Sequence, residues 1–255
     1  MYIDSHAHYD DGKYDEDRET VIKQVQEEIG IIINAGYNIE SSKFAVEVAS
    51  NNKKIYATVG ISPNDIQDFT TENLELIEKL AKDEKVLGIG EIGLDYYWNK
   101  DNKDLQLELF KAQIEIANKL NLPIIIHCRE AISDTLNILK NEKICKNVGV
   151  FHCCPLNREL VKEALKLGYY ISFAGPITFK NAKNADEIIN MVPIDKILTE
   201  TDSPYLTPEP LRGKRNDSRN VKYIAEKIAK VKNISVEELN NQIYINLKAI
   251  YKKIV

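Results

Sequence analysis

The chain has 255 residues, of which 44% are hydrophobic and 29% are charged, and its formal net charge at neutral pH is −5. This length and composition exclude a disordered protein and a small domain held together by disulfides, because a chain of this size buries a full core of its own. The negative balance excludes a surface coated in positive charge, although it leaves room for a local basic patch.

Short apolar, β-branched runs recur along the chain and predict eight strands. Several of them are apolar at every position, which is typical of parallel strands covered on both faces. The predicted strands are Met1–Asp4, Gly30–Ala35, Ile55–Gly60, Val86–Gly90, Pro123–His127, Val148–His152, Tyr169–Phe173 and Lys196–Glu200.

Amphipathic, charge-rich stretches lie between the predicted strands and predict helices. In the stretch from 104 to 120, apolar residues recur at helical spacing and are expected to face the core: Leu105, Leu109, Ala112, Ile116 and Leu120. A last helix is predicted to start near Ser235, because Ser235 and Glu238 have the spacing of a capping box. The clearest helical stretches are Asp17–Glu28, Asn73–Lys82, Asp104–Leu120, Asn157–Leu167 and Asp217–Lys232.

Eight alternating strand–helix units in one chain favour an α/β fold of the (β/α)8 or TIM-barrel type. A doubly wound open sheet is the alternative, since it has the same alternation. No internal repeat, low-complexity tract or linker divides the sequence, so residues 1–255 are expected to form a single domain.

The sequence gives no sign of membrane insertion or export. Its longest apolar runs, such as Ile29–Ile33 and Leu122–Ile126, are far shorter than the ~20 residues of a membrane helix. The first six residues lack the basic start and apolar run of a secretory signal. The four cysteines have no C-x-x-C spacing and are interpreted as reduced thiols. A cytoplasmic location is therefore expected, with no membrane partner and no obligate protein partner.

All four histidines stand at the carboxyl end of a predicted strand or just past it, and two carboxylates join them there. A single histidine in such a place is as easily a structural residue. Together, however, the six side chains supply enough ligands for two divalent cations that share a bridging carboxylate at the mouth of the barrel. These residues are His6, His8, Glu91, His127, His152 and Asp202.

A metal site predicts hydrolysis without a serine or cysteine nucleophile, because divalent cations lower the pKa of a bound water and polarise the oxygen under attack. The sequence has no G-x-S-x-G elbow and no P-loop. Residues Gly88–Gly93 match G-x-G-x-x-G, but Leu94–Asn99 are expected to form a loop, whereas a dinucleotide site needs a helix at that point.

Five segments carry these residues in fixed order and spacing: Ile3–His8, Gly90–Tyr96, Ile126–Ala131, Phe151–Cys153 and Thr199–Leu206. Together they resemble the TatD family of metal-dependent hydrolases, of the amidohydrolase-like superfamily. The resemblance implies a TIM barrel with two metal ions. His6, His8 and Asp202 would hold the first ion, His127 and His152 the second, and Glu91 would bridge them.

The same resemblance implies a divalent-metal-dependent deoxyribonuclease, in some members a 3′–5′ exonuclease, that cleaves phosphodiester bonds with a metal-activated water. Glu91 and Asp202 would be its catalytic residues, and the cations would be Mg, Mn or Zn, which suit these ligands. The expected substrate is a nucleic-acid end, either single-stranded DNA or a tRNA 3′ end. The alternatives are a D-aminoacyl-tRNA deacylase, a hydrolase of a small-molecule ester or amide, and a non-enzymatic binding module.

Basic and aromatic residues near the predicted mouth are candidates for substrate contact. Arg212, Lys214 and Arg215 follow the last strand, and Arg129 follows His127; these side chains either bind phosphate or form a solvated, paired surface. The aromatic run Tyr96–Trp98 either stacks on an unpaired base or caps the barrel.

Two loops depart from the family pattern, at Ser62 and Asn64 and at Cys154 and Pro155. These departures affect probable substrate loops and leave every proposed metal ligand in place. Cys128 and Cys153 each follow a candidate ligand histidine, and strand alternation predicts that both thiols point away from the site.

Overall fold

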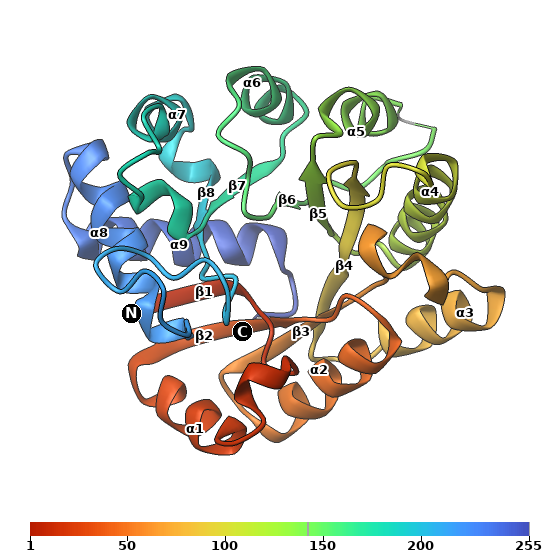
Figure 1. The fold of residues 1–255 in the computed structure, drawn as a ribbon, viewed down its shortest axis with the longest axis horizontal. Coiled ribbons are helices and arrows are strands. Elements are labelled where there is room, and N and C mark those ends of the chain that lie inside the picture. The colour runs from red at the N-terminus through yellow and green to blue at the C-terminus, as the bar shows by residue number, and fades with distance from the viewer. Residues whose placement is uncertain (142, 255) are drawn as a thin grey trace.

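The computed structural model describes residues 1–141 and 143–254, and within them eight parallel strands alternate with helices around a nearly closed barrel (Figure 1). Each strand pairs with the next one along the chain, from β1 to β8. The strands are β1 (Tyr2–Ala7), β2 (Ile29–Ala35), β3 (Ile55–Val59), β4 (Val86–Asp95), β5 (Ile124–Arg129), β6 (Val150–Phe151), β7 (Tyr170–Phe173) and β8 (Ile197–Thr199). All eight predicted strands are confirmed.

The return of the last strand to the first distinguishes the barrel from an open sheet. A parallel bridge joins Ala7 to Ser203, just beyond β8. The Thr199 hydroxyl also donates to the Ile3 carbonyl at 2.9 Å. The TIM-barrel prediction is therefore confirmed.

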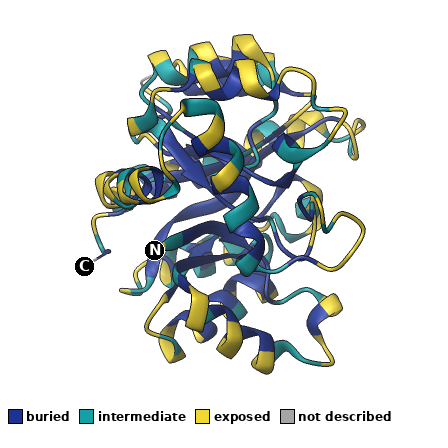
Figure 2. Cartoon of the chain, turned by 90° about the vertical axis from the view of Figure 1, so that its left-hand side faces the viewer, coloured by how far each residue is buried: buried dark blue, intermediate teal, exposed yellow. Residues whose placement is uncertain are grey.

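Helices surround the barrel and turn their exposed faces outward, while the strands inside are buried (Figure 2). They are α1 (Arg18–Glu28), α2 (Ile39–Asn51), α3 (Thr71–Leu80), α4 (Lys103–Leu120), α5 (Ile132–Leu139), α6 (Arg158–Lys166), α7 (Ala185–Met191), α8 (Val221–Lys232) and α9 (Val236–Ile250). The capping box of α9 is present, since Ser235 and Glu238 satisfy each other's backbone N–H groups. No helix in the described ranges combines the length and apolarity that crossing a membrane requires.

Two local predictions are wrong. Residues Leu94 and Asp95 belong to β4, which runs to Asp95 and is buried throughout, so they are not loop. In α4, Leu109 and Ile116 are buried as predicted, but the core face is rotated away from Leu105, which is 49% exposed. Buried glutamines occupy part of the true face, because Gln106 and Gln113 each bond to backbone groups of neighbouring loops. Apolar spacing alone does not reveal such polar core residues.

The rotated face of α4 gives a stability prediction. Phe110 is fully buried, so Phe110→Ala is expected to lower the free energy of unfolding by about 3–5 kcal/mol. Leu105→Ala, five residues earlier on the same helix, is expected to change it by less than about 0.5 kcal/mol, because its side chain is half exposed. Denaturant unfolding of both variants checks the difference. Equal losses would contradict the observed orientation of α4.

Candidate metal centre

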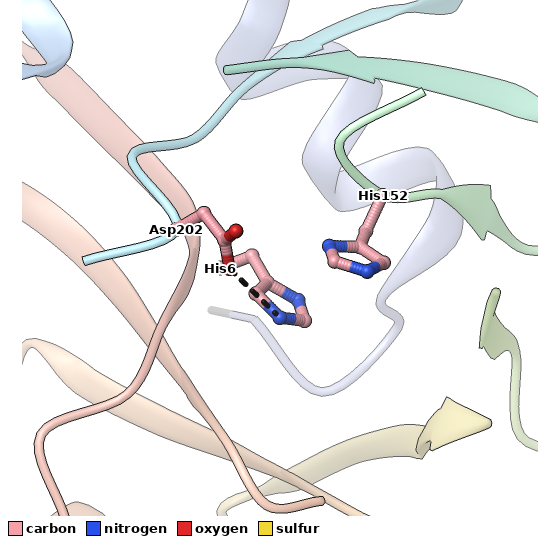
Figure 3. A group of neighbouring side chains, drawn as sticks. All are labelled: His6, His152 and Asp202. Carbon is pink, nitrogen blue, oxygen red and sulfur yellow. Dashed lines mark ion pairs between the residues drawn. The ribbon is translucent and has the colours of Figure 1, made fainter. Parts of the chain in front are cut away.

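The six candidate ligands converge at the carboxyl ends of the strands, as the order of strands in a parallel barrel dictates. His6, Glu91 and His127 lie within β1, β4 and β5. His8, His152 and Asp202 follow the ends of β1, β6 and β8. All except the buried His6 line one cleft of about 690 Å³. Figure 3 shows His6, His152 and Asp202 turned toward one another, and the rings of His6 and His152 stack with centroids 4.1 Å apart.

The two oxygens of Glu91 face two different pairs of histidines. Oε2 lies 3.3 Å from His6 Nε2 and 3.7 Å from His8 Nε2. Oε1 lies 2.8 Å from His127 Nδ1 and 3.3 Å from His152 Nε2. The carboxylate therefore stands between the pairs, with one oxygen available to each side. This is the arrangement of a bridging ligand.

Asp202 adds a second carboxylate on the side of His6 and His8. Its Oδ1 lies 3.3 Å from His8 Nε2 and 3.9 Å from His6 Nε2. The backbone around Asp202 is hydrogen-bonded to β1 and the residue after it. The Asp202 N–H donates to the His6 carbonyl at 2.9 Å, and the His8 N–H donates to the Ser203 carbonyl at 2.7 Å. These hydrogen bonds between the segment after β8 and the end of β1, called the joint between β8 and β1 below, set the position of Asp202.

A buried carboxylate, Asp4, holds the same joint from inside the barrel. It accepts hydrogen bonds from the Thr201 N–H at 2.8 Å and from the Thr201 hydroxyl at 2.6 Å. Burial raises the pKa of Asp4 to about 7, although hydrogen bonds from Ser218 and Thr201 oppose the shift. Asp4 fixes the backbone next to Asp202 without entering the metal cluster.

The outward ring nitrogens of His8 and His127 meet hydrogen-bond acceptors, and that of His152 lies near a carboxylate without a hydrogen bond to it. His8 Nδ1 lies 2.9 Å from the Ala35 carbonyl, and His127 Nε2 lies 3.0 Å from Asp95 Oδ2. His152 Nδ1 faces Glu200 Oε1 at 3.4 Å. A neutral imidazole with its proton on the outward nitrogen has a lone pair on the inward one. Such outer partners are typical of metal-binding histidines.

These lone pairs point at carboxylate oxygens, which are hydrogen-bond acceptors too. Two acceptors at this distance repel each other unless a proton or a cation lies between them. Imidazole nitrogen and carboxylate oxygen are suitable donors for divalent zinc, manganese or magnesium. Three groups of donor atoms lie within 4.8 Å of one another: His6, His152 and Asp202; His6, His8 and Glu91; and Glu91, His127 and His152. The residues present therefore fit a divalent metal.

Electrostatics keep the bridging carboxylate charged. When no metal is bound, protons on the inward nitrogens take its place. Burial by itself raises the pKa of Glu91, but the charge of protonated His152 and hydrogen bonds from His127, His152 and His6 hold that pKa well below its usual range. Glu91 is consequently an anion across the neutral pH range and available as a ligand.

Asp95 is a site residue that the sequence analysis missed. Besides facing His127, its Oδ1 accepts the backbone N–H groups of Tyr97 at 2.9 Å and Trp98 at 3.0 Å. Burial opposes ionisation, but the hydrogen bonds from His127 and Trp98 lower the pKa of Asp95 to about 2. A signal was present, since Glu91 and Asp95 are four residues apart and share a strand face. The interpretation of residues 94–99 as a loop concealed it.

Replacing Asp95 by asparagine is expected to lower metal affinity about 10- to 100-fold, the usual effect of removing a partner that orients a metal-binding histidine. Calorimetric titration of metal-free protein measures the affinity. Asp134→Asn is the matched control, because Asp134 accepts a 2.8 Å hydrogen bond from Tyr96 and lies outside the metal cluster. Wild-type affinity in a folded Asp95→Asn protein would contradict this role.

Of the four basic candidates, Arg129 lines the cleft and the other three do not. The Arg212 guanidinium lies over the Phe179 ring, 4.1 Å from its centroid. Arg215 makes a two-point ion pair with Asp17 at 2.7 and 2.6 Å. Lys214 lies near Arg215 in a separate surface depression. The basic run after β8 is thus mostly engaged outside the cleft.

Cys128 and Cys153 are both among the residues that border the cleft, and Cys128 is buried. Strand alternation fails for Cys153, since β6 ends at Phe151 and Cys153 has a positive φ of 36°. Neither thiol is in the three donor groups found among the described residues. Two residues at which the sequence departs from the family pattern, Ser62 and Asn64, also line the cleft, and Asn64 donates to Asp95 at 3.3 Å.

Comparisons with known proteins agree with this fold and with a metal-dependent hydrolase. A family model described as TatD related DNase matches residues 3–252. The chain is 43% identical over 253 residues to the uncharacterized metal-dependent hydrolase YabD of Bacillus subtilis, covering 99% of both chains. It is 36% identical to the uncharacterized metal-dependent hydrolase YcfH of Escherichia coli, covering 93% of this chain and 90% of that one.

Solved structures give the same picture at lower identity. The TatD homologue YjjV of Escherichia coli superposes with a TM-score of 0.91 at 24% identity, covering 98% of each chain. A hydrolase TatD family protein of Entamoeba histolytica superposes with a TM-score of 0.88 at 25% identity, again covering 98% of each.

Proposed function

The chain belongs to the TatD family of metal-dependent hydrolases, and from this premise we propose that it is a deoxyribonuclease of the 3′–5′ exonuclease type. The observation that supports the chemistry best is Glu91, whose two oxygens each face a separate histidine pair. Hydrolysis at such a site needs no nucleophilic side chain from the protein.

The proposed cofactor is a pair of divalent cations. His6, His8 and Asp202 would hold one, His127 and His152 the other, and Glu91 would be shared. Bound there, the cations would supply an activated water and would polarise the phosphoryl oxygen. The contacts of His8 with the Ala35 carbonyl, of His127 with Asp95 and of His152 with Glu200 would keep the three imidazole rings in place during the reaction.

Asp202 is proposed as the proton acceptor. Burial raises its pKa, but the hydrogen bond and charge of His8 outweigh that effect and lower the pKa of Asp202. The carboxylate is thus ionised at neutral pH, and it borders the cleft where water and substrate enter. A group with these properties can take a proton from the attacking water.

The size and charge of the cleft favour the end of a nucleic-acid strand as substrate over a long stretch of the polymer. Its volume of about 690 Å³ falls within the ~300–1,000 Å³ of small-ligand sites. Arg129 brings a positive charge to it. A net charge of −5 suits a substrate that makes few phosphate contacts, such as the end of single-stranded DNA or of a tRNA.

The decisive experiment uses metal-stripped protein resupplied with magnesium, manganese or zinc. Single-stranded DNA labelled at its 5′ end is assayed beside a D-aminoacyl-tRNA, with Asp202→Ala as the blank. A metal-dependent ladder shortened from the 3′ end, absent in the variant, would support the proposal. Intact DNA with released amino acid would replace the nuclease by a deacylase. No turnover of either substrate would redirect the search to small esters and amides.

A further inference from the structure

The residues after β4 form an exposed aromatic surface on the rim of the cleft. Trp98 is 65% exposed and Tyr97 is 44% exposed, whereas Tyr96 is buried and its hydroxyl donates to Asp134. Tyr96 therefore belongs to the hydrophobic core, while Tyr97 and Trp98 are open to solvent. Large exposed aromatic groups beside a site are typical of binding surfaces. Trp98 borders the same cleft as His127 and Asp202.

The exposed rings are held in fixed positions before any ligand binds. The Tyr97 and Trp98 rings meet edge to face, with centroids 4.8 Å apart and planes at 87°. Their backbone N–H groups both donate to Asp95. Gln106 holds the following turn through the Asn99 carbonyl at 2.9 Å. A preorganised surface loses little conformational entropy when it binds.

Arg129 completes the surface from the end of β5. Its guanidinium carbon lies 4.0 Å from the Tyr97 ring centroid and 5.4 Å from that of Trp98. Arg129 is exposed and lines the cleft, where its charge can face a phosphate. Exposed aromatic rings beside an arginine are the elements that bind unpaired bases in single-stranded nucleic acid.

We propose that Trp98, with Tyr97 and Arg129, is a stacking platform for one unpaired nucleobase near the cleaved end of the substrate. The inference rests on the proposed nuclease function and adds to it a determinant of substrate choice. A base inside a duplex is already stacked on its neighbours, so the platform favours single-stranded ends. Because every base has an aromatic face, it tolerates sequence.

The kinetic test is a double-mutant cycle with oligonucleotides that carry one abasic site at each of the last four positions. In the wild type, one abasic position is expected to lower kcat/KM roughly 5- to 150-fold, the range that base stacking represents. Trp98→Ala is expected to lower kcat/KM for normal DNA by a similar factor and to abolish the effect of that abasic site. Tyr244→Ala, a partly buried tyrosine on α9 beside Lys248, is the control.

A second readout is independent of hydrolysis, because Trp98 is the only tryptophan of the chain. Its fluorescence is expected to be quenched by dAMP and not by deoxyribose 5-phosphate. Hydrolysis that is insensitive to every abasic site, or equally sensitive in Trp98→Ala, would overturn the platform and leave the nuclease standing. Absence of all DNA hydrolysis would overturn the nuclease, and the titration would then decide alone: selective quenching supports the platform, and none overturns it.

Discussion

Replacing Glu91 by glutamine is expected to reduce hydrolysis by about 10³-fold or more, because metal ions stabilise developing charge by several kcal/mol and this residue faces both halves of the cluster. An amide offers one acceptor oxygen, so it serves one histidine pair and presents N–H groups to the other. Turnover at saturating substrate and metal, together with the metal content of the purified protein, measures the loss.

Glu115→Gln is the matched control for this substitution, since Glu115 lies on the exposed face of α4. It is expected to retain wild-type activity. Thermal unfolding of Glu91→Gln establishes that the barrel still folds. A folded Glu91→Gln protein with near wild-type turnover would exclude Glu91 as the shared ligand.

Metal removal is expected to lower the melting temperature as well as to abolish activity. The ligands come from five strand ends that are dispersed in the unfolded chain, so the ion binds the folded state preferentially. At a metal concentration of ~100 times Kd this adds about 2.7 kcal/mol. For a protein of this size, that corresponds to roughly 5–10 °C.

Melting curves with EDTA and with each restored metal measure this shift. The Glu91→Gln variant is expected to show a smaller shift, because it has lost a shared ligand. An unchanged melting temperature at metal concentrations that restore activity would contradict a metal centre built across these strands.

The fold was predictable because short apolar runs, several of them apolar on both faces, alternate with helices that are apolar on one face. The cluster was predictable in position, since His6, His127 and His152 stand at or just past the carboxyl ends of separate strands that meet at the same mouth. The alternation and spacing of apolar residues do not predict which residues contact each other across the fold. The pairing of Arg215 with Asp17 joins residues far apart in sequence. The core face of α4 depends on hydrogen bonds from the Gln106 and Gln113 side chains to backbone groups outside the helix.

The candidate site, too, was predictable only in part from the sequence. Asp95 went unseen because its role depends on where β4 ends, and strand ends are the least determined feature of an apolar pattern. The aromatic run after it was left open between two roles. The structure separates them, since Tyr96 is buried against Asp134 while Trp98 remains in contact with solvent.

The joint between β8 and β1 has a consequence for the order in which the protein is made. Thr199 bonds to Ile3, 196 residues earlier, and Asp202 is fixed by that same joint. At translation rates of ~5–20 residues per second, His6 is added to the growing chain roughly 10–40 seconds before Asp202. Until then the first strand has β2 on one side and no partner on the other. A nascent chain therefore holds the candidate metal ligands as an incomplete set until Asp202 has been added.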